Sequence, residues 1–199
     1  MKKINNQKEF LVIALLVAAL NLGYFFVEFY IANTIHSVSL FADSIDFLED
    51  SALYLLAAVG ILLSTKFRAY LGYMLSITLL IPSIFTLMTG YTQFYERLLP
   101  DYSLLTMTAL GALVVNIICA LMLTRYRESN ESVVLAAYMS ARNDAFANIG
   151  IIGAGIATFY SPFWIYDFIV GAGILLLNLD AFWKVFQRAQ FQSKEHHEH

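Results

Sequence analysis

Long apolar segments occupy most of this 199-residue chain. A helix needs about 20 mostly apolar residues to cross the hydrocarbon core of a membrane, and six segments reach that length. They are Phe10–Ile31, Ser37–Leu63, Tyr70–Thr89, Ser103–Leu123, Val133–Phe159 and Phe163–Phe186. Because 59% of the residues are hydrophobic and 14% are charged, a soluble fold of this size could not cover its apolar surface. The sequence therefore predicts an all-α membrane protein with six transmembrane helices in a lipid bilayer.

Charge and cysteine content exclude two further classes of protein. The net charge is −3 and the basic residues form no patch, which argues against nucleic-acid binding. The single cysteine, Cys119, cannot form a disulfide within the chain. A secreted disulfide scaffold is therefore excluded as well.

Lysine and arginine gather at the N-terminus, in alternate connections and in the tail, and such residues mark the cytoplasmic side of a membrane. They are Lys2, Lys3, Lys8, Lys66, Arg68, Arg125, Arg127, Lys184, Arg188 and Lys194, whereas the remaining connections hold only Arg97. Both termini are therefore expected in the cytoplasm, with the chain in the cell membrane. The predicted organisation is a cytoplasmic N-terminus at 1–9, a transport domain at 10–187 and a short tail at 188–199.

The second apolar segment carries four acids at membrane depth, and each costs about 2.5–3.5 kcal/mol to insert there. They are Asp43, Asp46, Glu49 and Asp50. At 100° per residue these acids share an arc of about 120°. A rise of 1.5 Å per residue places Asp46 about 14 Å and Asp50 about 20 Å from the start of the segment, near the membrane midplane.

The fifth segment repeats this pattern in the opposite direction. Ser140, Asp144 and Asn148 follow one another at four-residue spacing and so share one helix face. Two antiparallel helices can thus bring Asp46, Asp50 and Asp144 to one level, and such oxygen clusters coordinate divalent cations. Carboxylates crowded in a medium of low dielectric constant cannot all stay ionised. A site that alternates between protons and a metal ion satisfies them in each state, which indicates a proton–metal antiporter.

Arg142 offers an alternative to metal binding, because it can pair with an acid as a structural ion pair. One arginine cannot neutralise four or five acids, so the structural interpretation is the weaker one. Arg142 either extends toward the cytoplasm or pairs with a site acid as a tethered counter-ion. The candidate partners are Asp43, Glu49 and Asp180.

Motifs in three of the segments resemble the cation diffusion facilitator family of metal exporters. The second segment reads Ser37-Val-Ser39-Leu40-Phe-Ala42-Asp43-Ser-Ile-Asp46-Phe-Leu-Glu-Asp50, which matches the family pattern S-x-S-L-x-A-D-x-x-[HD]-x-x-x-D throughout. The fifth carries Ser140-Ala-Arg-Asn-Asp144 followed by small residues, and the sixth begins Trp164-Ile165-Tyr166-Asp167, without the proline that is common in the family. The resemblance covers all six segments and is most specific in the second.

The resemblance implies that Asp46, Asp50 and Asp144 are three of four ligands of the transported metal. The fourth position, usually His or Asp, is Ser140 here, so Asn143, Asn148 or water is a candidate substitute. By the same resemblance Asp43 lies toward the outer mouth, in a structural or gating role. The cytoplasmic domain of the family is expected to be absent, leaving a transmembrane domain alone. The expected protein partner is a second copy of this chain, which would associate through the transmembrane helices.

The function expected from these motifs is efflux of a divalent metal ion in exchange for protons, by rocking of helices around a midplane site. Zn²⁺ is the first expectation, with Co²⁺ and Cd²⁺, while an oxygen-rich site also admits Mn²⁺ and Fe²⁺. No resident cofactor is expected. The alternative is a transport-inactive metal sensor or accessory membrane subunit. A membrane enzyme is not expected, because the D-G and A-R pair of alcohol phosphotransferases and the G-x-G-D pattern of aspartyl proteases are both missing.

Three further sets of ionisable residues each allow two interpretations. Glu28 is either an acid of the outer vestibule or an interfacial charge, and the second is favoured. His36, on the helical stripe of Asp43 and Asp50, either assists metal exit or is a solvated loop histidine, again with the second favoured. The tail histidines, His196, His197 and His199, either gather cytosolic metal or belong to a flexible polar end, which is the favoured reading.

Overall fold

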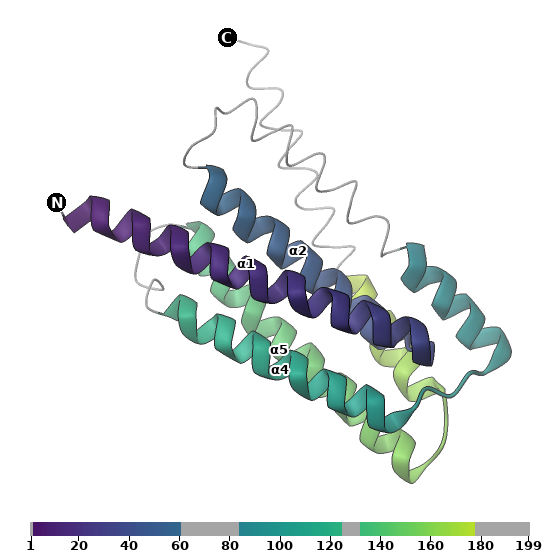
Figure 1. Ribbon diagram of the computed structural model, residues 1–199. Coiled ribbons are helices and arrows are strands. Elements are labelled where there is room, and N and C mark those ends of the chain that lie inside the picture. Colours follow the sequence, from purple (N-terminus) through teal and green to yellow (C-terminus); the bar gives the residue numbers. More distant parts are fainter. Residues whose placement is uncertain (1, 61–83, 125–131, 178–199) are drawn as a thin grey trace.

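The computed structural model describes residues 2–60, 84–124 and 132–177 (Figure 1). Side chains are not described at residues 2–8, 10, 56, 57, 59, 60, 124 and 132–143. Within the described ranges the chain forms helices and no strand, as expected. They are α1 (Lys2–Ile35), α2 (Val38–Gly60), a helix at 84–96, α4 (Tyr102–Thr124), α5 (Ser132–Tyr160) and a helix at Ile165–Leu177.

Several predicted features lie outside the described residues. They are most of the third span with Pro82, the basic residues Lys66, Arg68, Arg125 and Arg127, the candidate partner Asp180, and the C-terminal tail with its three histidines. Ser140, Arg142 and Asn143 belong to α5, but their side chains are outside the description as well.

The connections that the structure describes, at 36–37, 97–101 and 161–164, are short, and local capping explains where two helices begin. His36 has a positive φ of 54°, which breaks the helical path after α1. Ser37 then caps α2, since the backbone N–H of Leu40 donates to its Oγ at 3.2 Å. Asp101 caps α4 in the same way, because the N–H of Leu104 donates to its Oδ1 at 2.8 Å. These caps satisfy N–H groups that the first helical turn leaves without partners.

Four of the helices pack together as a bundle. In Figure 1, α1 runs beside α2 and α4 runs beside α5, and contacts also join α1 to α4 and α2 to α5. The helix 84–96 packs against the helix Ile165–Leu177 through Phe94, whose ring lies 5.8 Å from that of Trp164 and 5.8 Å from that of Phe168. This pair meets the bundle at the start of α2, where Gly90 lies beside Val38.

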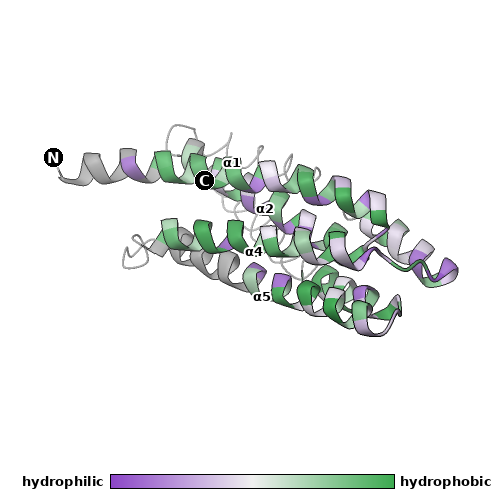
Figure 2. Cartoon of the chain, turned by 60° about the horizontal axis from the view of Figure 1, so that its bottom comes forward, coloured by the Kyte–Doolittle hydropathy of each residue, from purple (hydrophilic) through white to green (hydrophobic). Residues whose placement is uncertain are grey.

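The exterior of the described helices is apolar. Figure 2 shows hydrophobic residues over most of their length, and large side chains such as Leu16, Phe26, Met107 and Leu121 are exposed. By length and composition, two helical stretches of the described part are able to cross a membrane, Leu11–Ile35 and Tyr102–Leu123. α2 lacks an equally apolar window because its four acids interrupt it. An exterior of this kind suits a lipid environment.

The bundle interior, by contrast, contains polar side chains from all four helices. Among the residues buried there are Asn21 and Glu28 of α1, Asp43 and Asp50 of α2, Asn116 of α4 and Asn148 of α5. Apolar packing encloses them, with Leu40 and Phe41 of α2 in one core cluster together with Leu105 of α4 and Ile151 of α5. Polar and ionisable groups inside an apolar membrane bundle are typical of a functional site.

Candidate functional site

The two aspartates predicted as ligands on α2 lie one helical turn apart, as their spacing requires. Asp50 is buried and Asp46 is partly exposed. The apolar face of α2 packs into the core through Phe41 and Phe47, and this packing fixes the rotation of the helix about its axis. The acids consequently lie toward α5 and α1 rather than toward the apolar exterior.

Asp144 of α5 lies within electrostatic range of these aspartates. It interacts with Asp50, Asp43 and Glu49, and its carboxyl group is within hydrogen-bonding reach of that of Asp50. Asp46 in turn interacts with Asp144. The antiparallel packing of α2 and α5 therefore brings the three aspartates into one neighbourhood.

The acids of this neighbourhood do not form a closed coordination shell. Across the described part of the chain, no group of three or more His, Cys, Asp or Glu side chains lies close enough to hold a metal ion together. Glu49 is partly exposed and interacts with Asp46 and Asp144 from the edge of the group. Any ion bound among the aspartates therefore needs a small approach of α2 and α5 or ligands beyond these acids.

Asn148, a predicted accessory residue, lies one turn beyond Asp144. Its side chain is fully buried, and its Nδ2 donates a hydrogen bond of 2.9 Å to the backbone carbonyl of Asp144. The amide lies beside Asp43 of α2. Asn148 thus links the aspartate neighbourhood to a second pair of acids.

That second pair is Glu28 of α1 and Asp43 of α2. Both side chains are fully buried, and the two carboxyl groups lie within hydrogen-bonding reach of each other. Apart from each other and the amide of Asn148 beside Asp43, the four oxygens have no hydrogen-bond partner among the described residues. The favoured prediction of an interfacial charge for Glu28 is wrong, because α2 and the bundle cover it. Glu28 follows Asn21 by seven residues and Tyr24 by four, so the three polar side chains share one face of α1. This shared polar face is the sequence pattern that could have predicted that Glu28 points into the bundle.

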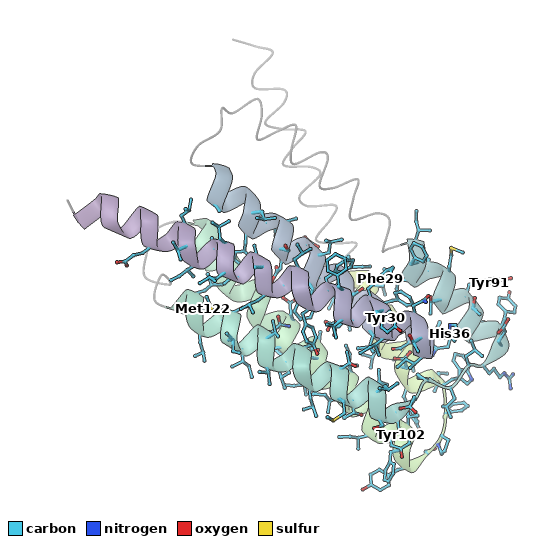
Figure 3. All side chains as sticks on the ribbon, in the orientation of Figure 1. Phe29, Tyr30, His36, Tyr91, Tyr102 and Met122 are labelled. Atoms are coloured by element: carbon cyan, nitrogen blue, oxygen red, sulfur yellow. The ribbon has the colours of Figure 1, made fainter. Side chains whose placement is uncertain are left out.

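His36 was predicted to lie on the same helical stripe as Asp43 and Asp50, but it does not belong to α2. It stands exposed in the turn between α1 and α2, and Figure 3 shows it at the end of α1, toward the other end of the bundle from Met122. The stripe stops before His36 because its positive φ takes the backbone out of the helix. The favoured interpretation as a solvated loop histidine fits this position.

Asp167 is a buried acid that sequence reasoning noticed only as part of a motif. It accepts hydrogen bonds from the hydroxyl of Ser37 at 2.7 Å, the N–H of Val38 at 2.8 Å, the hydroxyl of Ser39, and Nε2 of Gln93 at 3.0 Å. The carboxylate thus joins the helix Ile165–Leu177 and the helix 84–96 to the N-terminus of α2, where the helix dipole favours a negative charge. The pair of serines in the motif has a structural reason, since both donate to Asp167.

Comparison with known proteins agrees with this arrangement. Residues 14–189 match the family described as the cation efflux transmembrane domain. None of the curated proteins matches the chain. The family domain is a helical membrane domain, so the predicted all-α membrane fold with six helices is confirmed. Because the match spans most of the sequence, the chain belongs to the cation efflux family of membrane transporters, also called the cation diffusion facilitators.

Proposed function

We propose that this cation efflux transporter exports a divalent metal ion from the cytoplasm in exchange for protons. The observation that carries the proposal is the neighbourhood of Asp46, Asp50 and Asp144 inside a bundle with an apolar exterior. Carboxylates at this depth are costly unless a cation or protons neutralise them. A transported cation supplies that neutralisation in one state and protons supply it in the other.

In this proposal Asp46, Asp50 and Asp144 bind the ion, and the position of Ser140 contributes the fourth ligand either directly or through water. Their mutual reach across α2 and α5 supports this assignment. A small approach of the two helices would close the shell around the ion, and their separation would release it. Rocking of helices around a midplane site provides such a motion.

The metal class follows from the ligands. Family resemblance places Zn²⁺ first, with Co²⁺ and Cd²⁺ as companions. The aspartates contribute only oxygen atoms, and harder cations such as Mn²⁺ and Fe²⁺ also accept such a set. We therefore propose Zn²⁺ as the principal substrate and Mn²⁺ and Fe²⁺ as competing substrates.

The proposed topology has both termini in the cytoplasm, with residues 1–9 and 188–199 flanking the transport domain at 10–187. The distribution of lysine and arginine supports it. In this orientation the turn at His36 faces the outer side of the cell membrane. A second copy of the chain is proposed to associate through the transmembrane helices.

A transport-inactive sensor or accessory subunit is the competing function. Two observations favour it, the serine at position 140 and the open arrangement of the described acids. Such a protein would bind metal through the same aspartates without releasing it across the membrane. Flux separates the two functions.

The test is metal uptake into sealed proteoliposomes under an imposed pH gradient, comparing Zn²⁺, Co²⁺, Mn²⁺ and Fe²⁺. We expect gradient-dependent uptake by the wild type and its loss in Asp50→Asn. Asp101→Asn is the matched control, because Asp101 is an exposed acid in a connection. Metal binding without uptake of any of the four ions would favour the sensor or accessory subunit. Equal uptake by wild type and Asp50→Asn would reject the proposed ligands.

A further inference from the structure

We propose that Glu28, Asp43 and Asn148 form a second cation site, separate from the aspartates of α2 and α5, that takes a hard divalent cation. Only the identification of this cation with the transported substrate rests on the proposed function. The site lies where α1, α2 and α5 each contribute one fully buried polar side chain.

The first support is an excess of acceptors over donors. Both oxygens of Glu28, both oxygens of Asp43 and Oδ1 of Asn148 are buried, and the only donor among the described residues within reach of the two acids is the amide nitrogen of Asn148, beside Asp43. Asn148 is an independent indication, because it is neutral, its nitrogen donates to the carbonyl of Asp144 and lies beside Asp43, and its buried Oδ1 receives no hydrogen bond from the described residues. The acceptor oxygens of the two acids and the amide thus outnumber the donors beside them, and buried oxygens without a partner are strongly disfavoured.

The second support is that the hydroxyl of Tyr24, a donor near both acids, is engaged elsewhere. Tyr24 lies one turn before Glu28 on α1 and within electrostatic range of both acids. Its hydroxyl donates instead to the backbone carbonyl of Thr108 on α4, at 2.7 Å. The hydroxyl group of Tyr24 therefore does not donate to Glu28 or Asp43, and the two acids need another partner.

Charge and ligand type indicate which partner that is. Two carboxylates carry two negative charges, which one divalent cation or two protons neutralise completely, whereas one shared proton neutralises them only by half. Carboxylate and amide oxygens are the ligands that hard cations such as Mn²⁺, Mg²⁺ and Ca²⁺ prefer. The site holds two acids and an amide, so it is consistent with the absence of any three-acid group in the described part.

The position of the site gives it a role in transport. Asp43 precedes Asp46 by three residues, about 4.5 Å along the helix axis toward the start of α2. Glu28 also interacts with Asp46. An ion that leaves the aspartates toward the His36 end of the bundle meets Glu28 and Asp43 next, so the second site is a waypoint for the cation.

The experiment counts Mn²⁺ ions bound to the full chain in lipid nanodiscs, from the loss of the free Mn²⁺ electron paramagnetic resonance signal. The background variant carries Asp46→Asn, Asp50→Asn and Asp144→Asn, which remove the proposed transport ligands. We expect about two Mn²⁺ ions per wild-type chain and about one in the background. Adding Glu28→Gln should abolish the remaining binding, whereas adding Glu96→Gln, at an exposed acid of the helix 84–96, should retain it.

Two results would overturn the site. One is a background variant that binds no Mn²⁺. The other is a count in the background variant that Glu28→Gln leaves unchanged, because the acids would then hold protons rather than a cation. Should Glu28→Gln fail to fold, Asn148→Ala in the background is expected to weaken Mn²⁺ binding at least about tenfold, and an unchanged affinity would contradict the proposal. Binding in the background does not require transport, so a wild type without metal flux would reject the proposed function and leave this site standing.

Discussion

Two buried acidic regions of the molecule are opposites in their hydrogen bonding. At the start of α2, the carboxylate of Asp167 accepts four hydrogen bonds from two helices and a capping serine. Deeper in the bundle, Glu28 and Asp43 face each other, and the only donor beside them among the described residues is the amide of Asn148. A buried acid with a full set of donors is part of the scaffold, whereas the acids that lack one are those for which we propose a cation. The comparison separates structural from functional carboxylates in a chain that is rich in both.

The largest expected effect comes from removing the satisfied carboxylate. Asp167→Ala leaves two serine hydroxyls, one backbone N–H and the amide of Gln93 buried without their acceptor. We expect a loss of about 3–5 kcal/mol in stability, the usual cost of breaking a buried charged network. Thermal unfolding in detergent measures it. A melting temperature equal to that of the wild type would show that Asp167 is not part of the scaffold.

The next effect tests the close approach of helices beside Asp167. A Cβ at Gly171 would lie 2.6 Å from the backbone N of Ser39 and 2.6 Å from the backbone C of Val38. Gly171→Ala should therefore destabilise the protein by about 1–3 kcal/mol, as overpacking does. Gly173→Ala on the same helix is the control, because no atom lies within 4 Å of its Cβ position. Equal melting temperatures for the two variants would contradict the packing.

A smaller effect is expected from removing one of the four donors. Ser39→Ala deletes a hydroxyl that donates to Asp167 and leaves the other three donors in place. A hydrogen bond to a charged group contributes about 1.5–3 kcal/mol, and we expect the lower end because the remaining donors compensate. The measurement is again thermal unfolding. A loss as large as that of Asp167→Ala would indicate that Ser39 has a further role.

The smallest change in stability is expected at the unsatisfied acids. Glu28→Gln in the absence of divalent metal removes a buried charge that has no partner, so it should leave the melting temperature unchanged or raise it. Added Mn²⁺ should stabilise the wild type more than Glu28→Gln, because a bound ligand stabilises only the folded state that binds it. A strong destabilisation by Glu28→Gln without metal would place Glu28 with Asp167 in the scaffold and remove the contrast between the two regions.

Sequence reasoning predicted the helical fold and the shared neighbourhood of the acids of α2 and α5, because the spacing of residues along each helix indicates both. The predicted span Ser103–Leu123 differs by one residue at each end from α4, and Val133–Phe159 differs by one at each end from α5. The first span was expected to begin at Phe10, but α1 begins at Lys2. Hydropathy predicts only the part of a helix that lies in the hydrocarbon core. The helix itself continues through the polar residues that precede this apolar part, as α1 does from Lys2.

The environment of the individual acids was less predictable, since it depends on contacts far apart in the sequence. The partners of Asp167 at the start of α2 precede it by about 130 residues, and no local spacing announces them. Glu28 was interpreted from its place near the end of an apolar segment, and only the packing of α2 and α4 against α1 reveals that it is buried. The sequence motifs indicate which positions carry acids. The packing of the helices decides which of these acids receive hydrogen bonds.

The central claim is that the acids without scaffold roles exchange a metal ion for protons, and the movement of protons tests it most directly. Proteoliposomes are prepared with equal pH inside and outside and a pH-sensitive dye in the lumen, and Zn²⁺ is then added outside. We expect the internal pH to rise as Zn²⁺ enters and protons leave, and we expect both movements to vanish in Asp50→Asn. Entry of Zn²⁺ with no change of internal pH would contradict proton exchange.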